Sequence, residues 1–215
     1  YERLEAVPSD QFVVYDDVNF IKQGWVNRNR ILLNGKEFLF TLQLKGASSF
    51  KHINQISVGS NKTKLLQTIE NAYRHTPFFE DAIPIVKTIL ECCEDNLALF
   101  NYQLLHRICE FLDIHTDLIL SSTIEKNNAL KGQEKIISIC KKLGTTIYIN
   151  SFGGSELYQK EIFQKHNLEL FFLHPQEIKY SQQIPEFIPW LSIIDVMMFN
   201  QKADIRKMLS QYILA

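Results

Sequence analysis

The sequence lacks an excess of basic residues. Its 23 lysines and arginines are balanced by 24 acidic residues, which gives a formal net charge of −1. Binding to a nucleic-acid backbone depends on a cationic surplus that neutralises phosphates. The overall charge balance therefore argues against nucleic acid as a partner.

Long apolar runs are also missing. The longest, such as Ile193–Phe199, fall far short of the roughly 20 residues that cross a bilayer. No secretory signal is visible, although the sequence opens at Tyr1 without an initiator methionine, which leaves room for a leader upstream. We expect no membrane span and a cytoplasmic location.

Cysteine is scarce, and its spacing matches neither a zinc site nor a redox Cys-x-x-Cys pair. The four positions are Cys92, Cys93, Cys109 and Cys140. All of them fall in segments with helical apolar periodicity, which predicts buried free thiols in a reducing compartment. The six histidines also lack metal-ligand spacing, so no metal site is expected.

The residues present predict one α/β domain over 1–215 with a helical segment at 61–112. Phe12–Tyr15 indicates a buried strand. Asn34-Gly35, between Ile31–Leu33 and Glu37–Leu44, is typical of a type I′ hairpin turn. Within the helical segment, apolar residues recur at helical spacing in three runs, which predicts three helices. The first covers 65–73, the second begins near Asp81 with Pro84 in its first turn, and the third covers 97–111.

Beyond residue 116 the pattern alternates between strand and helix. "DLILSS", "TTIYIN" and "LELFFL" indicate strands, separated by helices over "GQEKIISICKKLG" and "SELYQKEIFQKHN". Gly144 is placed to end the first of these helices, while Ser155 and Asn167 are placed to begin and end the second. This order predicts a largely parallel sheet flanked by helices in Rossmann-like layers.

Candidate site residues follow the strands, because ligands bind beyond the carboxyl ends of strands in open α/β sheets. Asp16 and Asp17 come directly after the first strand. Neighbours on an extended chain point to opposite faces, so the pair does not form a glycosidase dyad. One carboxylate is expected to face a ligand, and the alternative is that both are ordinary acids of a turn.

The run Asn27-Arg28-Asn29-Arg30 places two guanidinium groups on one face of an extended chain, about 7 Å apart. Forked guanidinium donors suit a diphosphate or carboxylate. A solvated edge strand is the alternative. Trp25 offers either a stacking surface for a sugar or base, or a packing side chain.

Two further segments are candidates. In "YINSFGGSELY", Asn150, Ser151, Gly153 and Gly154 lead from a strand into a helix, where backbone N–H groups attract anions. A plain strand-to-helix turn is the alternative. Asp195 lies inside an apolar helical run and needs either a buried partner or a ligand.

Three blocks, "FVVYDDVNFIKQGWVNRNRIL", "YINSFGGSELY" and "EFIPWLSIIDVMMFN", resemble those of the WbqC-like protein family. The resemblance covers nearly the whole chain. It implies a bacterial protein of O-antigen or lipopolysaccharide biosynthesis, described as a glycine transferase or a formyltransferase for a nucleotide-linked amino sugar. The site positions that it implies are Asp16, Asp17, Asn19, Lys22, Asn27, Arg28, Arg30, Asn150, Gly153, Gly154, Glu186, Ser192 and Asp195.

The sequence departs from the family pattern at its start. Family members usually begin with a further strand and a Gln-Pro-x-Tyr segment, whose tyrosine Tyr1 matches. On this resemblance, the first strand and a part of the site precede the printed sequence.

The leading functional interpretation is an acyl or aminoacyl transferase acting on a nucleotide sugar. Arg28 and Arg30 would bind the diphosphate, while Asp16 or Asp17 would take the proton from the sugar ammonium. No serine or cysteine is visibly activated, which favours direct transfer. The Asn–His–Asp set of folate-dependent formyltransferases is not recognisable, and the donor cofactor is not identified. The alternative is a non-catalytic module that binds a sugar nucleotide or a partner enzyme, and a homodimer is the assembly considered.

Overall fold

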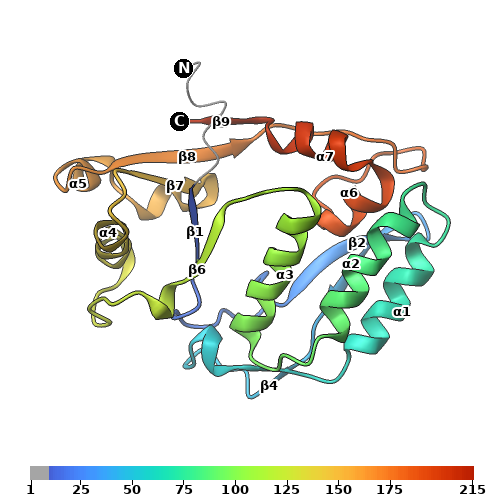
Figure 1. Cartoon of the computed structure of the whole chain (residues 1–215), viewed down its shortest axis with the longest axis horizontal. Helices are drawn as coiled ribbons and strands as arrows, with labels where there is room; N and C mark the ends of the chain where they lie inside the picture. The colour runs from blue at the N-terminus through green and yellow to red at the C-terminus, as the bar shows by residue number, and fades with distance from the viewer. Residues whose placement is uncertain (1–9) are drawn as a thin grey trace. The chain divides into compact units, whose positions relative to one another are not determined.

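The structure is a computed structural model that describes residues 10–215, so the expectation for Tyr1 falls outside the described residues. The chain divides into two compact units (Figure 1). The first comprises the described part of Tyr1–Leu120 together with Ile178–Met208, and the second comprises Ser121–Glu177 and Leu209–Ala215. A single domain over 1–215 would require these two units to form one body. The expectation of a single domain therefore stays a prediction.

A parallel strand pair opens the first unit. β1 (Gln11–Val14) confirms the first predicted strand, one residue earlier than expected, and pairs with β6 (Asp117–Leu120), so that Val14 lies opposite Leu120. The strand is not buried as predicted, because Phe12 is 48% exposed. The carboxyl ends of both strands therefore meet at one edge. Asp16 and Asp17 leave the sheet at this edge.

The predicted hairpin is confirmed. β2 (Arg28–Leu33) and β3 (Lys36–Thr41) pair antiparallel around Asn34 and Gly35, whose φ angles are 52° and 73°. Two positive φ angles define a type I′ turn. The single strand expected over Glu37–Leu44 instead breaks after Thr41, and β4 (Leu44–Lys45) pairs with β5 (Ser57–Val58), close to the short 3₁₀ helix η1 (Ile53–Gln55).

Three helices follow, as predicted. They are α1 (Lys62–Tyr73), α2 (Phe79–Glu91) and α3 (Leu97–Phe111), and they lie side by side in front of β2 (Figure 1). Asn96 caps α3 by accepting hydrogen bonds from the N–H groups of Ala98 and Leu99. α2 begins two residues before Asp81, so Pro84 lies beyond the first turn and offers no N–H to the carbonyl four residues earlier.

Buried side chains of α1, α2, β2 and the C-terminal helices form the largest core cluster of the first unit. α6 (Ile193–Phe199) contributes Met197 and Met198, and α7 (Lys202–Leu209) contributes Ile205. These helices also supply Asp195 to the same core, at 0% exposure. The sheet that carries the arginines is thus packed against helices from both halves of the sequence.

The second unit is built around a three-stranded sheet. β7 (Ile147–Ser151) pairs parallel with β8 (Glu169–Pro175), and β9 (Tyr212–Leu214) pairs antiparallel with β8. The other elements are η2 (Ser121–Thr123), α4 (Gly132–Leu143), η3 (Phe152–Leu157) and α5 (Lys160–Gln164). Gly144 ends α4 at φ 68°, as predicted.

Two local predictions for this unit are corrected. The helix expected from Ser155 is replaced by the 3₁₀ helix η3 and the short helix α5, because Tyr158 is extended and its ring packs edge-on against Tyr148 and Phe163. Asn167 does end the helical segment, at φ 58°. The cysteines are all free, but only Cys140 is buried as predicted, whereas Cys92 and Cys109 are half-buried and Cys93 is exposed.

The sheet arrangement differs from the expected one. Over residues 10–215 the strands form four small sheets, and parallel pairing is limited to β1 with β6 and β7 with β8. β6 and β7 belong to separate sheets, so a largely parallel Rossmann-like sheet is not confirmed. The part of the chain that the structure describes holds no helix long and apolar enough to cross a membrane.

Candidate functional site

The two aspartates after β1 are buried. Asp16 is 2% exposed and Asp17 is 8% exposed. Asn54 donates to Asp16 twice, from Nδ2 to Oδ2 at 3.1 Å and from its backbone N–H to the carbonyl oxygen at 3.1 Å. Asp16 is therefore held by the segment that enters β5, and a substrate amine reaches either carboxylate only if the covering chain moves.

A cluster of cations and one aromatic ring lies at the start of β2. The guanidinium carbons of Arg28 and Arg30 lie 5.8 Å and 5.0 Å from the ring centroid of Trp25. Alternate residues of a strand share a face, so both arginines approach one indole. Trp25 is 60% exposed, which leaves the ring accessible to a ligand.

The arginines are only partly engaged by the protein. Arg28 Nε donates to the Gly24 carbonyl at 3.0 Å. Arg30 Nη1 forms an ion pair with Glu37 Oε2 at 3.0 Å, while Arg30 Nε is buried and donates to no acceptor within residues 10–215. A buried donor without an acceptor is costly, and an incoming anion would satisfy Arg30 Nε only if the atoms that cover it moved.

Other predicted residues of the first block have different surroundings. The Asn27 amide donates to the Leu42 carbonyl at 2.8 Å and closes the base of the hairpin. Asn19 pairs with His52 through the backbone, and both Asn19 and Lys22 are exposed. Asn27 thus orders the strand that carries the arginines, whereas the other two side chains face solvent.

Asp195 lies at the centre of a buried hydrogen-bond network. The hydroxyls of Tyr73 and Tyr180 donate to its carboxylate at 2.7 Å and 2.6 Å, and Gln182 Nε2 donates at 3.1 Å. Burial raises the pKa of Asp195, and these hydrogen bonds oppose the rise. Burial and the Asp195 charge raise the pKa of both tyrosines. These contacts give Asp195 the buried partners that its charge requires.

Sequence reasoning missed the tyrosines and the glutamine of this network. They are separated from Asp195 by 122, 15 and 13 residues, and no local spacing connects them. The network also holds β2 in place, because the Leu32 N–H donates to the Tyr73 hydroxyl at 2.9 Å. The backbone of the arginine strand is thereby tied to α1 and α6.

The third block also contacts β2. Ser192 caps α6, and its N–H donates to the Arg30 carbonyl at 2.7 Å. Trp190, two residues earlier, is 66% exposed and has a φ of 62°, which is rare for a bulky side chain. Such outliers gather at binding sites, and this one was also missed from the sequence. Glu186, by comparison, is an exposed residue of the preceding loop.

The second-block residues lie in the second unit. Asn150 Oδ1 accepts from the Ser151 N–H at 2.9 Å, and the Asn150 amide packs so closely on Gly154 that a Cβ there would overlap it. Gly153 is exposed, and a Cβ there would meet nothing within 4 Å. Where the sequence predicted the N-terminus of an α-helix, the structure has the six-residue 3₁₀ helix η3. That the segment from Asn150 to Gly154 and the two arginines line one ligand site stays a prediction.

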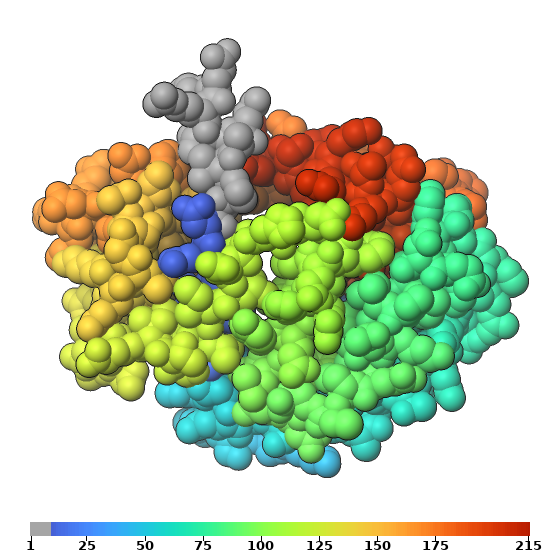
Figure 2. All heavy atoms as spheres, viewed as in Figure 1, coloured from blue at the N-terminus to red at the C-terminus, as the bar shows by residue number. Residues whose placement is uncertain are grey.

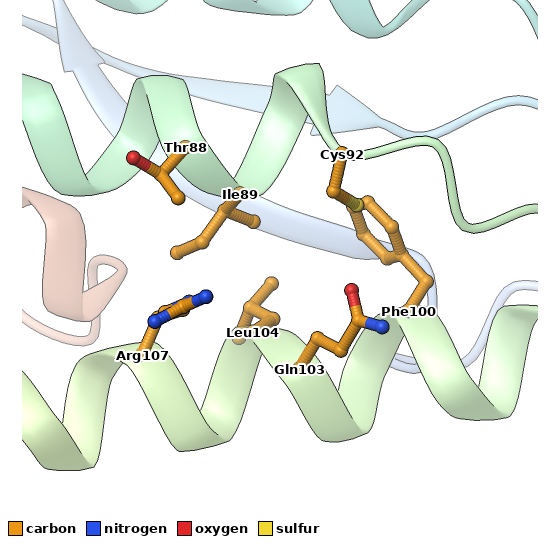
Figure 3. A pocket seen from close by; sticks show the side chains of 7 residues that line it. All are labelled: Thr88, Ile89, Cys92, Phe100, Gln103, Leu104 and Arg107. Carbon is orange, nitrogen blue, oxygen red and sulfur yellow. The ribbon is translucent and has the colours of Figure 1, made fainter.

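Two hollows lie away from these residues. One of about 70 Å³ lies between α2 and α3, and Figure 3 shows Cys92, Arg107 and five other side chains around it. The other, open and of about 780 Å³, runs along α4 and α5. No residue of the three sequence blocks lines either hollow. Within residues 10–215, His, Cys, Asp and Glu form no group of three or more that would hold a metal ion.

Comparison with known proteins places the chain in a family. The family model described as "WbqC-like protein family" matches residues 4–207. The chain is 28% identical over 200 residues to an uncharacterized protein, Rv1507c, of Mycobacterium tuberculosis, a match that covers 91% of this chain and 85% of that protein. No solved structure matches the chain. The chain therefore belongs to the WbqC-like protein family.

Proposed function

We propose that the chain transfers an acyl or aminoacyl group, such as glycyl or formyl, to the amine of a nucleotide-linked sugar. The reaction would serve bacterial surface polysaccharide (O-antigen) biosynthesis in the cytoplasm. The observation that carries the proposal is the cluster of Trp25, Arg28 and Arg30, with its accessible indole and its unsatisfied Arg30 donor.

The cluster has the chemistry to hold a diphosphate joined to planar or ring-shaped groups. Guanidinium groups donate in pairs to phosphate oxygens. An indole face stacks on a base or a sugar, and nearby cations strengthen its contacts. Ser192 and the Tyr73–Asp195 network keep β2 in place, so the two arginines are presented from a rigid strand.

The transfer needs a base and an acyl donor. The sugar ammonium loses a proton to Asp16 or Asp17, and the neutral nitrogen attacks the donor carbonyl. The C–N bond forms as the carbonyl π electrons move to oxygen. The return of these electrons breaks the bond to the donor's leaving group, which departs with the second proton of the nitrogen. Since both carboxylates are buried, substrate binding must move the covering chain before this proton transfer.

A second function has its own support. The burial of Asp16 and Asp17, with Asn54 holding Asp16, is the arrangement of a structural carboxylate. A non-catalytic module that binds a sugar nucleotide needs the arginines and the indole but no base. The two functions share a ligand and differ in turnover.

Binding and turnover separate them. The free energy of unfolding should rise by roughly 2.7 kcal/mol with a nucleotide sugar at 100 times its dissociation constant. Arg28→Ala and Arg30→Ala should abolish this rise, while Arg107→Ala, an exposed arginine on α3, should keep it. No rise with any nucleotide sugar refutes both functions.

Acyl transfer is then tested with candidate donors by mass spectrometry of the sugar. Asp16→Asn or Asp17→Asn should lower turnover by at least about 100-fold while ligand binding persists, as expected for loss of a general base. Binding without turnover in the unmodified chain identifies the module instead. Asn54→Ala reports whether release of Asp16 changes turnover without changing the ligand contacts.

A further inference from the structure

The cations of this chain are concentrated in one segment. Residues 18–69 contain eight lysines and arginines and one acidic residue, Glu37, so this segment carries +7 while the rest of the chain carries −8. Glu37 is already paired with Arg30. Among the described residues, the structure records an ion pair for none of the other seven cations. A near-neutral chain thus presents a strongly basic region.

Two large apolar side chains project from the same region. Phe50 is 92% exposed and Ile21 is 69% exposed. The segments around Phe20 and Lys51 run antiparallel, and the Phe20 N–H donates to the Lys51 carbonyl at 2.9 Å. Ile21 follows Phe20 and Phe50 precedes Lys51, so both apolar residues lie at the same end of this paired stretch. We call Ile21, Phe50 and Lys51 the Phe50 tip.

The loop that carries Phe50 and Lys51 is held in place by hydrogen bonds to Ser48. The Phe50 N–H donates to Ser48 Oγ at 3.3 Å, and the Lys51 N–H donates to the Ser48 carbonyl at 3.1 Å. Exposed lysines at positions 22 and 45 flank it. β4 and the loop after it lie at the lower edge of the first unit in Figures 1 and 2. The loop therefore holds an aromatic ring outward among cations.

We propose that the Phe50 tip docks the chain on an anionic membrane surface. Phe50 and Ile21 would enter the boundary between headgroups and acyl chains, where aromatic rings are favoured. Lys51 and the flanking lysines would lie against anionic headgroups, each strengthening binding about fivefold. The Phe50 tip lies outside the cluster of Trp25, Arg28 and Arg30, and the proposal holds whether or not the chain is a transferase.

The shape of the tip favours lipid over a macromolecular partner. A side chain that is 92% exposed stands on a convex surface, and a protein partner would need a matching concave pocket, whereas a lipid layer accommodates a protrusion of any shape. Single-stranded nucleic acid would use stacking rings, and Ile21 has none. Charge and apolar exposure together fit anionic lipid.

Co-sedimentation with vesicles tests the proposal. The full chain should bind phosphatidylcholine vesicles that contain phosphatidylglycerol and should bind pure phosphatidylcholine at least about tenfold more weakly, with binding to anionic vesicles falling as salt is raised. Phe50→Ser should weaken binding at least about tenfold, from the lost burial of its ring. Lys51→Glu should weaken it by about fivefold or more.

Matched variants serve as controls. Leu99→Ser removes an exposed leucine of α3, and Lys131→Glu reverses an exposed lysine outside residues 18–69, just before α4. Both variants should bind anionic vesicles like the unmodified chain. All four variants should keep the unmodified melting temperature. Equal binding to neutral vesicles, or full binding by Phe50→Ser, overturns the proposal. Binding of a single-stranded oligonucleotide that competes with vesicles and needs Phe50 overturns it in favour of nucleic acid.

Discussion

The hydroxyl of Tyr73 joins three elements of the first unit, and its removal tests the buried network. Tyr73 is fully buried, accepts from the Leu32 N–H at 2.9 Å and donates to Asp195 at 2.7 Å. Tyr73→Phe keeps the ring and leaves both partners in place. The change therefore isolates two hydrogen bonds with little change in packing.

The magnitude follows from the groups left behind. A buried N–H without an acceptor costs about 1–3 kcal/mol, and a hydrogen bond to a charged group contributes about 1.5–3 kcal/mol. Tyr180 and Gln182 still donate to the carboxylate, so the second loss is partly compensated. We expect Tyr73→Phe to lower the free energy of unfolding by roughly 3 kcal/mol.

Urea denaturation monitored by circular dichroism measures this loss. If only stability has changed, the slope of the free energy of unfolding against urea concentration stays the same. Tyr102→Phe is the matched control, because its half-buried hydroxyl donates one hydrogen bond, to the Leu118 carbonyl at 3.2 Å. It should cost about 1 kcal/mol or less. A loss below about 1 kcal/mol for Tyr73→Phe would mean that the network does not hold β2 as described.

Three further predictions concern other parts of the chain. Gly154→Ala should lower the free energy of unfolding by about 1–3 kcal/mol through overlap with a neighbouring amide, whereas Gly153→Ala, into open space, should be neutral within about 0.5 kcal/mol by the same urea assay. Since burial raises the pKa of Asp195 above 3.8, its contribution to stability is present below pH 3.8 and is lost as pH rises through the folded-state pKa. The stability of the unmodified chain relative to Asp195→Asn should therefore fall as pH is raised from that value, and a relative rise would contradict the sign. Iodoacetamide at neutral pH should label the exposed Cys93 before Cys140, whose pKa burial raises to about 11, and peptide mass spectrometry showing the reverse order would contradict the burial.

Local chemistry made several elements predictable. Asn34-Gly35 forces two positive φ angles, Gly144 accepts the left-handed position at the end of α4, and apolar spacing marks the three helices from α1 to α3. Each of these signals acts within a few residues of the chain, so each can be recognised from the sequence alone. The arginine spacing at Arg28 and Arg30 belongs to the same class, because a strand alternates its faces.

Other features depend on residues that are far apart in the sequence. The largely parallel sheet predicted from the sequence is not confirmed, because β6 pairs with β1 and β7 pairs with β8 in separate sheets. The residues of a strand do not specify locally which strand will pair with it. The break at Tyr158 arises from ring packing against Tyr148, which outweighs the local preference for helix.

The sequence by itself determined the turn at Asn34-Gly35, the end of α4 at Gly144 and the shared face of the arginines, because these depend on backbone preferences and spacing over a few residues. Only the tertiary structure decided that Asp16 is buried under Asn54, that Asp195 is satisfied by Tyr73 and Tyr180, and that Phe50 projects outward. Burial and hydrogen-bond partners are properties of the packed chain, since they join residues separated by tens of positions.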